Sequence, residues 1–321
     1  MSATRNIEPY RVSNGLAGGH GWNHSVRRFS KRKYLYLMSL PVIVYFFVFG
    51  YLPMYGVVIA FQRYSPGKGV FGSPFIGFKN FTDFISSYYF WRLLINTTLI
   101  SLYDLIFAFP APIILALLMN EVKTKYFKRT VQTITYMPYF ISLVVVAGIL
   151  IDFCLPNGFI SDILVNFGIP RTNLLGKPEY FRTIYIGSGI WQGIGFGSII
   201  YLAAITAVDQ ELYEAAYMDG AGRLRQTWHI TLPCISSTII ILLILRVGNM
   251  LNVGYEKIIL LYSPLTYSVG DVISSFVYRK GLLESNYGYS SAVGLFNSVI
   301  NFILLVSANK ISKVLTKSSL W

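Results

Sequence analysis

Residues 34–61 read YLYLMSLPVIVYFFVFGYLPMYGVVIAF, an apolar run that contains no charged side chain. About 20 residues of α-helix, each rising about 1.5 Å, are enough to cross the roughly 30 Å of hydrocarbon in a bilayer. The run is longer than the apolar core of a cleavable signal peptide, and the residues before it are polar. We therefore expect residues 34–61 to stay in the membrane as an anchor.

The composition of the whole chain also indicates a membrane protein. Of the 321 residues, 54% are hydrophobic and 13% are charged, whereas an ordinary soluble domain has about 25% charged residues. The formal net charge of +13 would suit nucleic-acid binding if basic and aromatic side chains shared a soluble surface. Here the basic residues lie between apolar runs, where they orient the helices beside lipid headgroups. Membrane lipid, and no nucleic acid, is the expected surrounding.

Five further apolar runs follow the first, each bounded by charged, glycine or proline residues. Together they predict an all-α polytopic membrane protein with about six transmembrane helices, over residues 34–61, 93–119, 130–153, 183–208, 234–254 and 291–309. Six spans place both ends of the chain on one side. Cytoplasmic segments carry the excess of Lys and Arg, and these residues cluster in residues 5–33, 123–129, 223–225 and 310–317. We expect both termini to be cytoplasmic.

Prolines and glycines interrupt several spans. Pro53, Pro110, Pro112 and Pro138 each remove a backbone donor, which predicts either a static kink or a moving hinge. In the fourth span, glycine recurs every four residues and leaves a ridge without side chains, at Gly189, Gly193 and Gly197. Close helix packing is the favoured interpretation of this ridge, and a ligand-contact surface is the alternative.

One charged side chain lies deep in the fifth span. Arg246 is beyond mid-membrane, where a charge costs about 2.5–3.5 kcal/mol on insertion scales. It is expected to face an aqueous cavity, to pair with Asp104 or Asp152, or to snorkel outward. The same two carboxylates would carry protons in the alternative interpretation, a gradient-driven secondary transporter of a polar solute.

Asparagines accompany this arginine. Asn249 follows Arg246 by one turn, and Asn297 and Asn301 share a face of the sixth span. Hydrogen bonds between helices are the more ordinary role of such amides. The alternative is a substrate path suited to hydroxyl-rich, carboxylated sugars, lined by Arg246, Asn249, Asn297 and Asn301.

Residues that would support chemistry within the chain are missing from the sequence. It has no Gly-x4-Gly-Lys-Ser/Thr phosphate loop, so we do not expect it to bind ATP. Cys154 and Cys234 are too far apart for a disulfide framework or a metal site, and His20, His24 and His229 lack metal-ligand spacing. We expect a non-catalytic chain with no catalytic residue, cofactor or metal of its own.

The polar segment between the fourth and fifth spans, residues 209–233, reads DQELYEAAYMDGAGRLRQTWHITLP. Asp209 is a good N-cap, Asp219-Gly220 is a strong turn signal, and a second helical stretch leads to Pro233. This pattern predicts two short helices joined by a turn. Ala215 and Ala216 have such small side chains that the first helix could lie in a groove on another protein.

The same segment resembles the EAA loop of the permease subunits of binding-protein-dependent ABC importers. Glu214-Ala215-Ala216 is followed after three residues by Gly220, and after nine more by Ile230-Thr231-Leu232-Pro233. Looser similarity over much of residues 34–315 favours the MalF-related carbohydrate permeases, in particular importers of alginate or a related acidic polysaccharide. It rests on three segments: Gly77–Phe81, Asn96-Thr97 and Tyr287–Ala292.

The resemblance implies a type I importer permease that works by alternating access in the bacterial cytoplasmic (inner) membrane. Residues 1–33 would be a cytoplasmic basic tail, residues 34–92 the first helix and a periplasmic loop, and residues 93–315 the core permease domain. We call residues 209–233 the coupling loop. Its contacts with the ATPase would come from Glu214, Ala215, Ala216, Asp219, Gly220 and Arg223.

The partners of the chain also follow from the resemblance. They would be a second permease subunit, expected to be a distinct homologous chain, and two ATP-binding subunits that hold ATP and Mg. A periplasmic or extracellular solute-binding protein would deliver the sugar.

Overall fold

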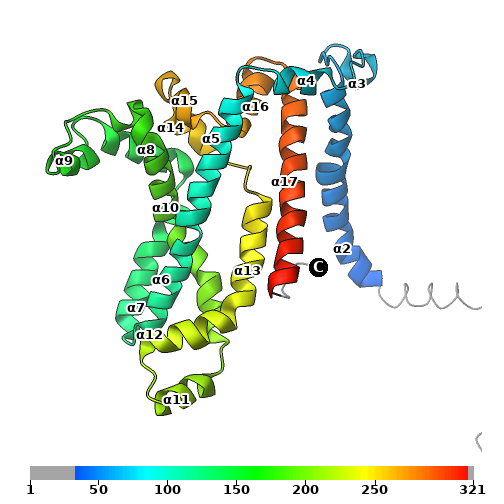
Figure 1. Cartoon of the computed structure of the whole chain (residues 1–321). Coiled ribbons are helices and arrows are strands. Elements are labelled where there is room, and N and C mark those ends of the chain that lie inside the picture. Colours follow the sequence, from blue (N-terminus) through cyan, green and yellow to red (C-terminus); the bar gives the residue numbers. More distant parts are fainter. Residues whose placement is uncertain (1–32, 317–321) are drawn as a thin grey trace, which may run out of the picture. The chain divides into compact units, whose positions relative to one another are not determined.

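A computed structural model describes residues 33–316 and shows a helical chain (Figure 1). Within these residues the β-structure is limited to one isolated bridge between Gln62 and Phe75. The prediction of an all-α protein is confirmed. Contact clustering divides the chain into two units, Met1–Gly56 and Val57–Trp321, which are described separately. Of the predicted basic tail, residues 1–32 lie outside the described residues.

The first unit contains the start of the first membrane run. Its elements are α2 (Lys33–Phe46), the π-helix η1 (Phe47–Tyr51) and the beginning of the 3-10 helix η2 (Leu52–Phe61), which continues into the second unit. Pro41 lies inside α2 and Pro53 near the start of η2. Proline has no backbone N–H to donate. The wider turn of the π-helix η1 and the tighter turns of the 3-10 helix η2 let the helix continue past Pro53 without that hydrogen bond.

Six helical runs within the described residues are long and apolar enough to cross a membrane, as predicted. They are Tyr36–Phe61, Phe90–Glu121, Leu143–Val165, Pro178–Thr206, Arg223–Gly248 and Tyr287–Val314. The second run consists of α5 (Phe90–Tyr103), the π-helix η3 (Asp104–Ala108) and α6 (Pro110–Glu121). The fourth and sixth correspond to α10 (Pro178–Thr206) and α17 (Tyr287–Thr316).

The third predicted span, residues 130–153, is not one continuous helix. The chain there forms α7 (Lys125–Tyr136), the 3-10 turn η4 (Met137–Phe140) and α8 (Leu143–Cys154), and α8 together with the following α9 (Phe159–Val165) makes up the run Leu143–Val165. Pro138 cannot donate to the preceding turn. Ser142 then caps α8, because its hydroxyl accepts a hydrogen bond from the Val145 amide at 3.4 Å.

The fifth run also ends earlier than predicted. It consists of α12 (Arg223–Gln226), the π-helix η6 (Thr227–Thr231) and α13 (Leu232–Gly248). The predicted span reached residue 254, but residues 249–254 are not helical. Gly248 packs so closely on α17 that an added methyl group would lie 2.4 Å from Leu305 Cδ1.

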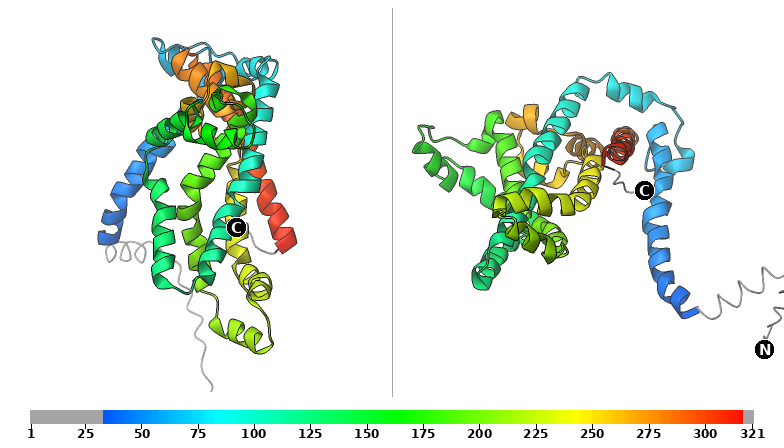
Figure 2. Two further views of the ribbon diagram at one scale, coloured as in Figure 1. Left: turned by 90° about the vertical axis from the view of Figure 1, so that its left-hand side faces the viewer. Right: turned by 60° about the horizontal axis from the view of Figure 1, so that its bottom comes forward.

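Short helices lie at both ends of the second unit. At one end, α11 (Gln210–Met218) belongs to the coupling loop. The opposite end carries the remaining elements (Figures 1 and 2): α3 (Gly69–Gly72), α4 (Lys79–Ile85), η5 (Leu174–Gly176), α14 (Tyr255–Leu261), η7 (Pro264–Thr266), α15 (Tyr267–Gly270), α16 (Ile273–Tyr278) and η8 (Arg279–Leu283).

Helix α10 is the central element of the second unit and contacts α6, α7 and α13. Around its first half, buried apolar side chains of α8, α10 and α14 form one core cluster, which includes Val146, Phe181 and Ile258. Around its second half, α6, α10 and α13 form another, which includes Ala116, Tyr201 and Ile235. The positions of α6 and α13 are therefore fixed through α10.

The closest approach along α10 is at Gly195. A methyl group at this position would lie 2.1 Å from the carbonyl oxygen of Thr135 in α7, whereas at Gly193 nothing lies within 4 Å. Gly195→Ala should push α7 away and lower the free energy of unfolding by about 1–3 kcal/mol, the usual cost of overpacking. Thermal unfolding of the detergent-purified protein measures this, with Gly193→Ala as the matched control. Equal stability of the two variants would contradict the assigned packing.

Candidate functional site

The coupling loop has the two short helices and the turn that its sequence predicts. Asp209 caps α11, since its Oδ1 accepts a hydrogen bond from the Glu211 amide at 3.0 Å. Gly220 has a φ of +74°, in the left-handed region that glycine adopts without strain. The predicted contact residues all lie on α11, on the turn or at the start of α12, and most are exposed: Glu214, Ala215, Ala216, Asp219, Gly220 and Arg223.

Large apolar side chains surround these residues on the surface. Tyr217, Met218, Leu224 and Trp228 are each more than 60% exposed. Four such side chains around one polar turn are more than a solvated loop requires, and contiguous apolar surface of this kind marks interaction sites. The sequence pattern indicated the small residues of this surface but not its apolar rim.

One side-chain contact holds the coupling loop together and another joins it to a membrane helix. Within the loop, the hydroxyl groups of Tyr213 and Thr231 are 2.9 Å apart, and from the loop to α6, Arg223 Nη1 donates to Glu121 Oε2 at 2.7 Å. Glu121 is the last residue of α6. Sequence reasoning singled out Arg223 but missed its partner, because the two are far apart in the chain and no spacing relates them.

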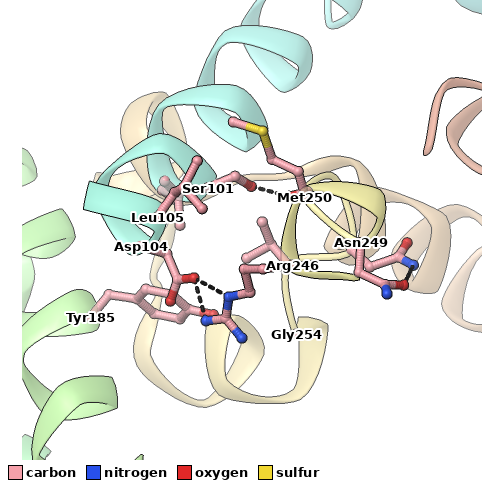
Figure 3. Close-up of a pocket in the computed structure, with 11 residues that line it drawn as sticks. Ser101, Asp104, Leu105, Tyr185, Arg246, Asn249, Met250 and Gly254 are labelled. Atoms are coloured by element: carbon pink, nitrogen blue, oxygen red, sulfur yellow. Dashed lines mark hydrogen bonds and ion pairs between the residues drawn. The ribbon is translucent and has the colours of Figure 1, made fainter. Parts of the chain in front are cut away.

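A second ion pair joins the same two helical runs deeper in the bundle (Figure 3). Arg246 Nε donates to Asp104 Oδ2 at 2.8 Å, and Arg246 Nη2 contacts the same oxygen. Asp104 begins the π-helix η3, and Arg246 lies in the last turn of α13. Of the partners considered for Arg246, Asp104 is the one it contacts. Asp152, at the end of α8, makes no ion pair with any described residue.

Two cavities meet at this ion pair. The loop-side cavity has a volume of about 610 Å³ and is lined by η3, α6, α10 and α13. The loop-distal cavity has a volume of about 230 Å³ and is lined by α5, η3 and the non-helical residues 249–254. The residues that line both cavities are Asp104, Tyr185, Arg246 and Asn249. The ion pair therefore lines both cavities.

The glycine ridge of α10 divides between two roles, so its favoured interpretation as a packing surface is only partly right. Gly189, Gly193 and Gly197 all line the loop-side cavity. A methyl group at Gly197 would lie 3.1 Å from Pro112 Cγ, which is close packing, but one at Gly193 would have open space around it. Gln192 also lines this cavity.

The asparagines of α17 do not line either cavity. Asn297 and Asn301 are each 6% exposed, and both donate to Asn252 Oδ1, at 3.0 and 3.1 Å. Asn301 Oδ1 accepts from the Leu251 amide at 3.0 Å. Their amides are instead used to hold the non-helical residues 249–254, the more ordinary role that the sequence favours, and the two cavities are lined without them. Asn249 lines both cavities.

A buried lysine that the sequence did not single out completes the loop-side cavity. Lys257, in the first turn of α14, is 9% exposed. Its Nζ donates to the Tyr185 carbonyl at 3.0 Å and lies 4.8 Å from the centre of the Tyr185 ring. Burial lowers the pKa of Lys257 to about 8, although the negative charge of Asp104 acts in the opposite direction. A basic residue outside every apolar run gives no sequence signal of burial.

The end opposite the coupling loop is held by a fully buried carboxylate. Asp271 accepts from Arg279 Nη2 at 2.7 Å and from Arg92 Nη2 at 3.3 Å. Burial by itself would lower the pKa of Arg279, but the hydrogen bonds and charge of Asp271 raise it overall. Nearby, Arg182 donates to Asn96 Oδ1 at 2.8 Å. These contacts tie α5 to α10 and, through Asp271 at the end of α15, to η8.

No group of three or more metal-ligating side chains occurs in residues 33–316. His20 and His24 lie outside the described residues, and His229 is in η6 within the coupling loop. The two cavities and the exposed coupling loop offer surfaces that can bind polar solutes and partner proteins.

Comparison with known proteins agrees with this arrangement. The profile of the family described as "Binding-protein-dependent transport system inner membrane component" matches residues 108–316. Protein LplB of Bacillus subtilis is 45% identical over 309 residues, which cover 95% of this chain and 96% of LplB. The polygalacturonan/rhamnogalacturonan transport system permease protein YteP of the same organism is 46% identical over 284 residues, 88% of each chain.

A chain in the crystal structure of a bacterial ABC transporter involved in the import of the acidic polysaccharide alginate has the same fold. It superposes with a TM-score of 0.85 at 43% identity, over 91% of this chain and 99% of that one. The resemblance that the coupling loop indicated is confirmed over the membrane helices as well. The chain therefore belongs to the family of inner membrane components of binding-protein-dependent transport systems.

Proposed function

We propose that this chain is the permease subunit that carries oligosaccharides with carboxylated sugar units into the cell. The relatives support this substrate class: YteP is named for polygalacturonan and rhamnogalacturonan, and the solved transporter imports alginate. All three are polymers rich in uronic acids. The cavities of this chain, with their cations, amides and tyrosines, offer donors and rings suited to such sugars.

The observation that carries this proposal is the meeting of two cavities at the Asp104–Arg246 ion pair. A transport path needs polar space on both sides of a closure within the membrane. The ion pair is this closure, and its opening would join the loop-distal cavity to the loop-side cavity. In the proposed path, Arg246 and Asn249 contact the passing sugar.

Partner ATPases open the closure from the coupling loop. Two ATP-binding subunits hold ATP and Mg and bind the surface that contains Glu214, Ala215 and Ala216. Arg223–Glu121 and Arg246–Asp104 each join the run Phe90–Glu121 to the run Arg223–Gly248, one at the coupling loop and one at the cavities. Movement of the loop therefore acts on both runs. If the helix bundle has two stable conformations, this movement shifts it from one to the other, which gives alternating access.

The orientation of the chain follows from the same assignment. The coupling loop and both termini are cytoplasmic, in agreement with the basic residues near them. A solute-binding protein docks at the opposite end; the alginate transporter has been solved in complex with its alginate pentasaccharide-bound periplasmic protein. A second, distinct permease subunit completes the path. The comparisons favour ATP over a proton gradient, because the chain resembles components of binding-protein-dependent and ABC transport systems, and Asp104, one of the two carboxylates considered for proton transfer, is engaged by Arg246.

Uptake by the complete transporter in proteoliposomes tests the function and the coupling loop together. With ATP inside and the solute-binding protein outside, we expect uptake of trigalacturonate. Gly220→Val should reduce it at least tenfold, because a β-branched residue is strained at the φ of +74°, while Gly220→Asn, which tolerates this conformation, should keep most of it. Wild-type uptake that needs an ion gradient and no ATP would contradict the proposal.

The path through the loop-side cavity is tested by filling it. Gly193 lines this cavity and has no atom within 4 Å of an added Cβ. Gly193→Leu should therefore leave the amount of assembled transporter unchanged and reduce uptake at least tenfold. Gly187→Leu is the matched control, since Gly187 lies on the same helix in equally open space and does not line the cavity. Equal uptake by both variants would show that the sugar passes elsewhere.

A further inference from the structure

Lys257 is held in place by apolar anchors on its own helix. Its neighbours Ile258 and Leu261 are buried in the core cluster that α14 shares with α8 and α10. The lysine side chain lies beside α10, where its ammonium donates to the Tyr185 carbonyl. The side chain is therefore held both at its base and at its tip, with its ammonium at the wall of the loop-side cavity.

The charge of this side chain is not balanced by the protein. Among the described residues, no carboxylate lies within 4 Å of the Lys257 ammonium, and the acidic residue that lines the loop-side cavity, Asp104, is paired with Arg246. Two cations and one carboxylate therefore line this cavity. Lysines are almost never buried without a partner, because removing an ammonium from water is costly.

The ammonium also has unused hydrogen-bonding capacity. It can donate three hydrogen bonds, and among the described residues it makes one. The lowered pKa of Lys257 has the same cause, since burial disfavours its charged form. A bound anion would favour the charged form of Lys257, so a negatively charged ligand would be stabilised at this site.

The cavity wall leaves room for a sugar at this point. A methyl group at Gly189 would lie 3.5 Å from Lys257 Nζ, so the bare backbone of α10 lies directly beside the ammonium. Gly193, one turn further along, leaves open space. The amide of Gln192 lines the same wall and can contact sugar hydroxyls.

From these observations we infer that Lys257 is a specificity-determining residue, which binds the carboxylate of a uronic acid unit in the loop-side cavity. This inference rests on the proposed function and adds to it the residue that recognises the acidic group. The charge-assisted hydrogen bond between ammonium and carboxylate is stronger than a bond to a neutral sugar hydroxyl. Neutral sugars would pass the same wall without this contact.

Ligand binding to the purified complete transporter tests the assignment. Isothermal titration calorimetry gives the Kd for trigalacturonate and for its fully methyl-esterified form, which has the same sugars without the charges. We expect Lys257→Met to weaken binding of trigalacturonate at least tenfold and to leave binding of the ester within twofold. Lys257→Arg should retain the preference for the acid. Should the methionine variant fail to assemble, Lys257→Gln keeps a donor for the Tyr185 carbonyl and removes the charge.

Each result bears on the inference differently. If the neutral variants bind trigalacturonate as tightly as the wild type, Lys257 does not recognise the carboxylate. If they lose acid and ester equally, its role is to hold α14 against α10, and the inference is again overturned. Failure of the wild-type transporter to take up any oligosaccharide in the proteoliposome assay would instead overturn the proposed function itself.

Discussion

The ion pair between Asp104 and Arg246 is the contact on which the proposed transport path depends. A single charge at the centre of a membrane helix costs about 2.5–3.5 kcal/mol on insertion scales, so neither residue would be stable facing lipid alone. Pairing solves this problem and joins the run Phe90–Glu121 to the run Arg223–Gly248, which Arg223–Glu121 and the packing on α10 also hold together. Because the pair also lines both cavities, the interaction that stabilises the bundle is, in the proposed mechanism, the one that opens during transport.

Backbone hydrogen bonding sets the second constraint. In hydrocarbon every amide and carbonyl needs a partner, and non-helical backbone is tolerated at membrane depth where protein surrounds it. Residues 249–254 leave the helix just after Arg246, and the side chains of Asn301 and Asn297 provide part of the missing bonds: Asn301 Oδ1 accepts from the Leu251 amide and Asn297 Nδ2 donates to the Leu251 carbonyl. This break lines the loop-distal cavity and leads the chain to α14, which brings Lys257 to the wall of α10. The helix end thus shapes both cavities.

Much of the fold follows from local sequence patterns. Apolar runs predict six spans, and the spacing from Glu214 to Pro233 predicts the coupling loop, because both signals are contained within short stretches. Local sequence does not predict the break at Pro138, since a proline can either kink a helix or end it. It does not predict the early end of α13 either. The partners of Arg223, Asn297 and Lys257 come from segments far along the chain, and only folding brings them together. The burial of Lys257 could not be predicted for a further reason: it lies outside the apolar runs, and a lysine there is ordinarily solvated.

Efflux from preloaded proteoliposomes, without ATP or solute-binding protein, tests the closure most directly. Vesicles that contain the complete wild-type transporter should retain radiolabelled trigalacturonate. Arg246→Asp should release it at least tenfold faster, because two like charges then face each other across the closure. The exchange variant Asp104→Arg/Arg246→Asp, which restores an opposite-charge pair, should retain the sugar nearly as well as the wild type. Vesicles with Arg246→Asp that remain as tight as wild-type vesicles would show that this ion pair does not close the path.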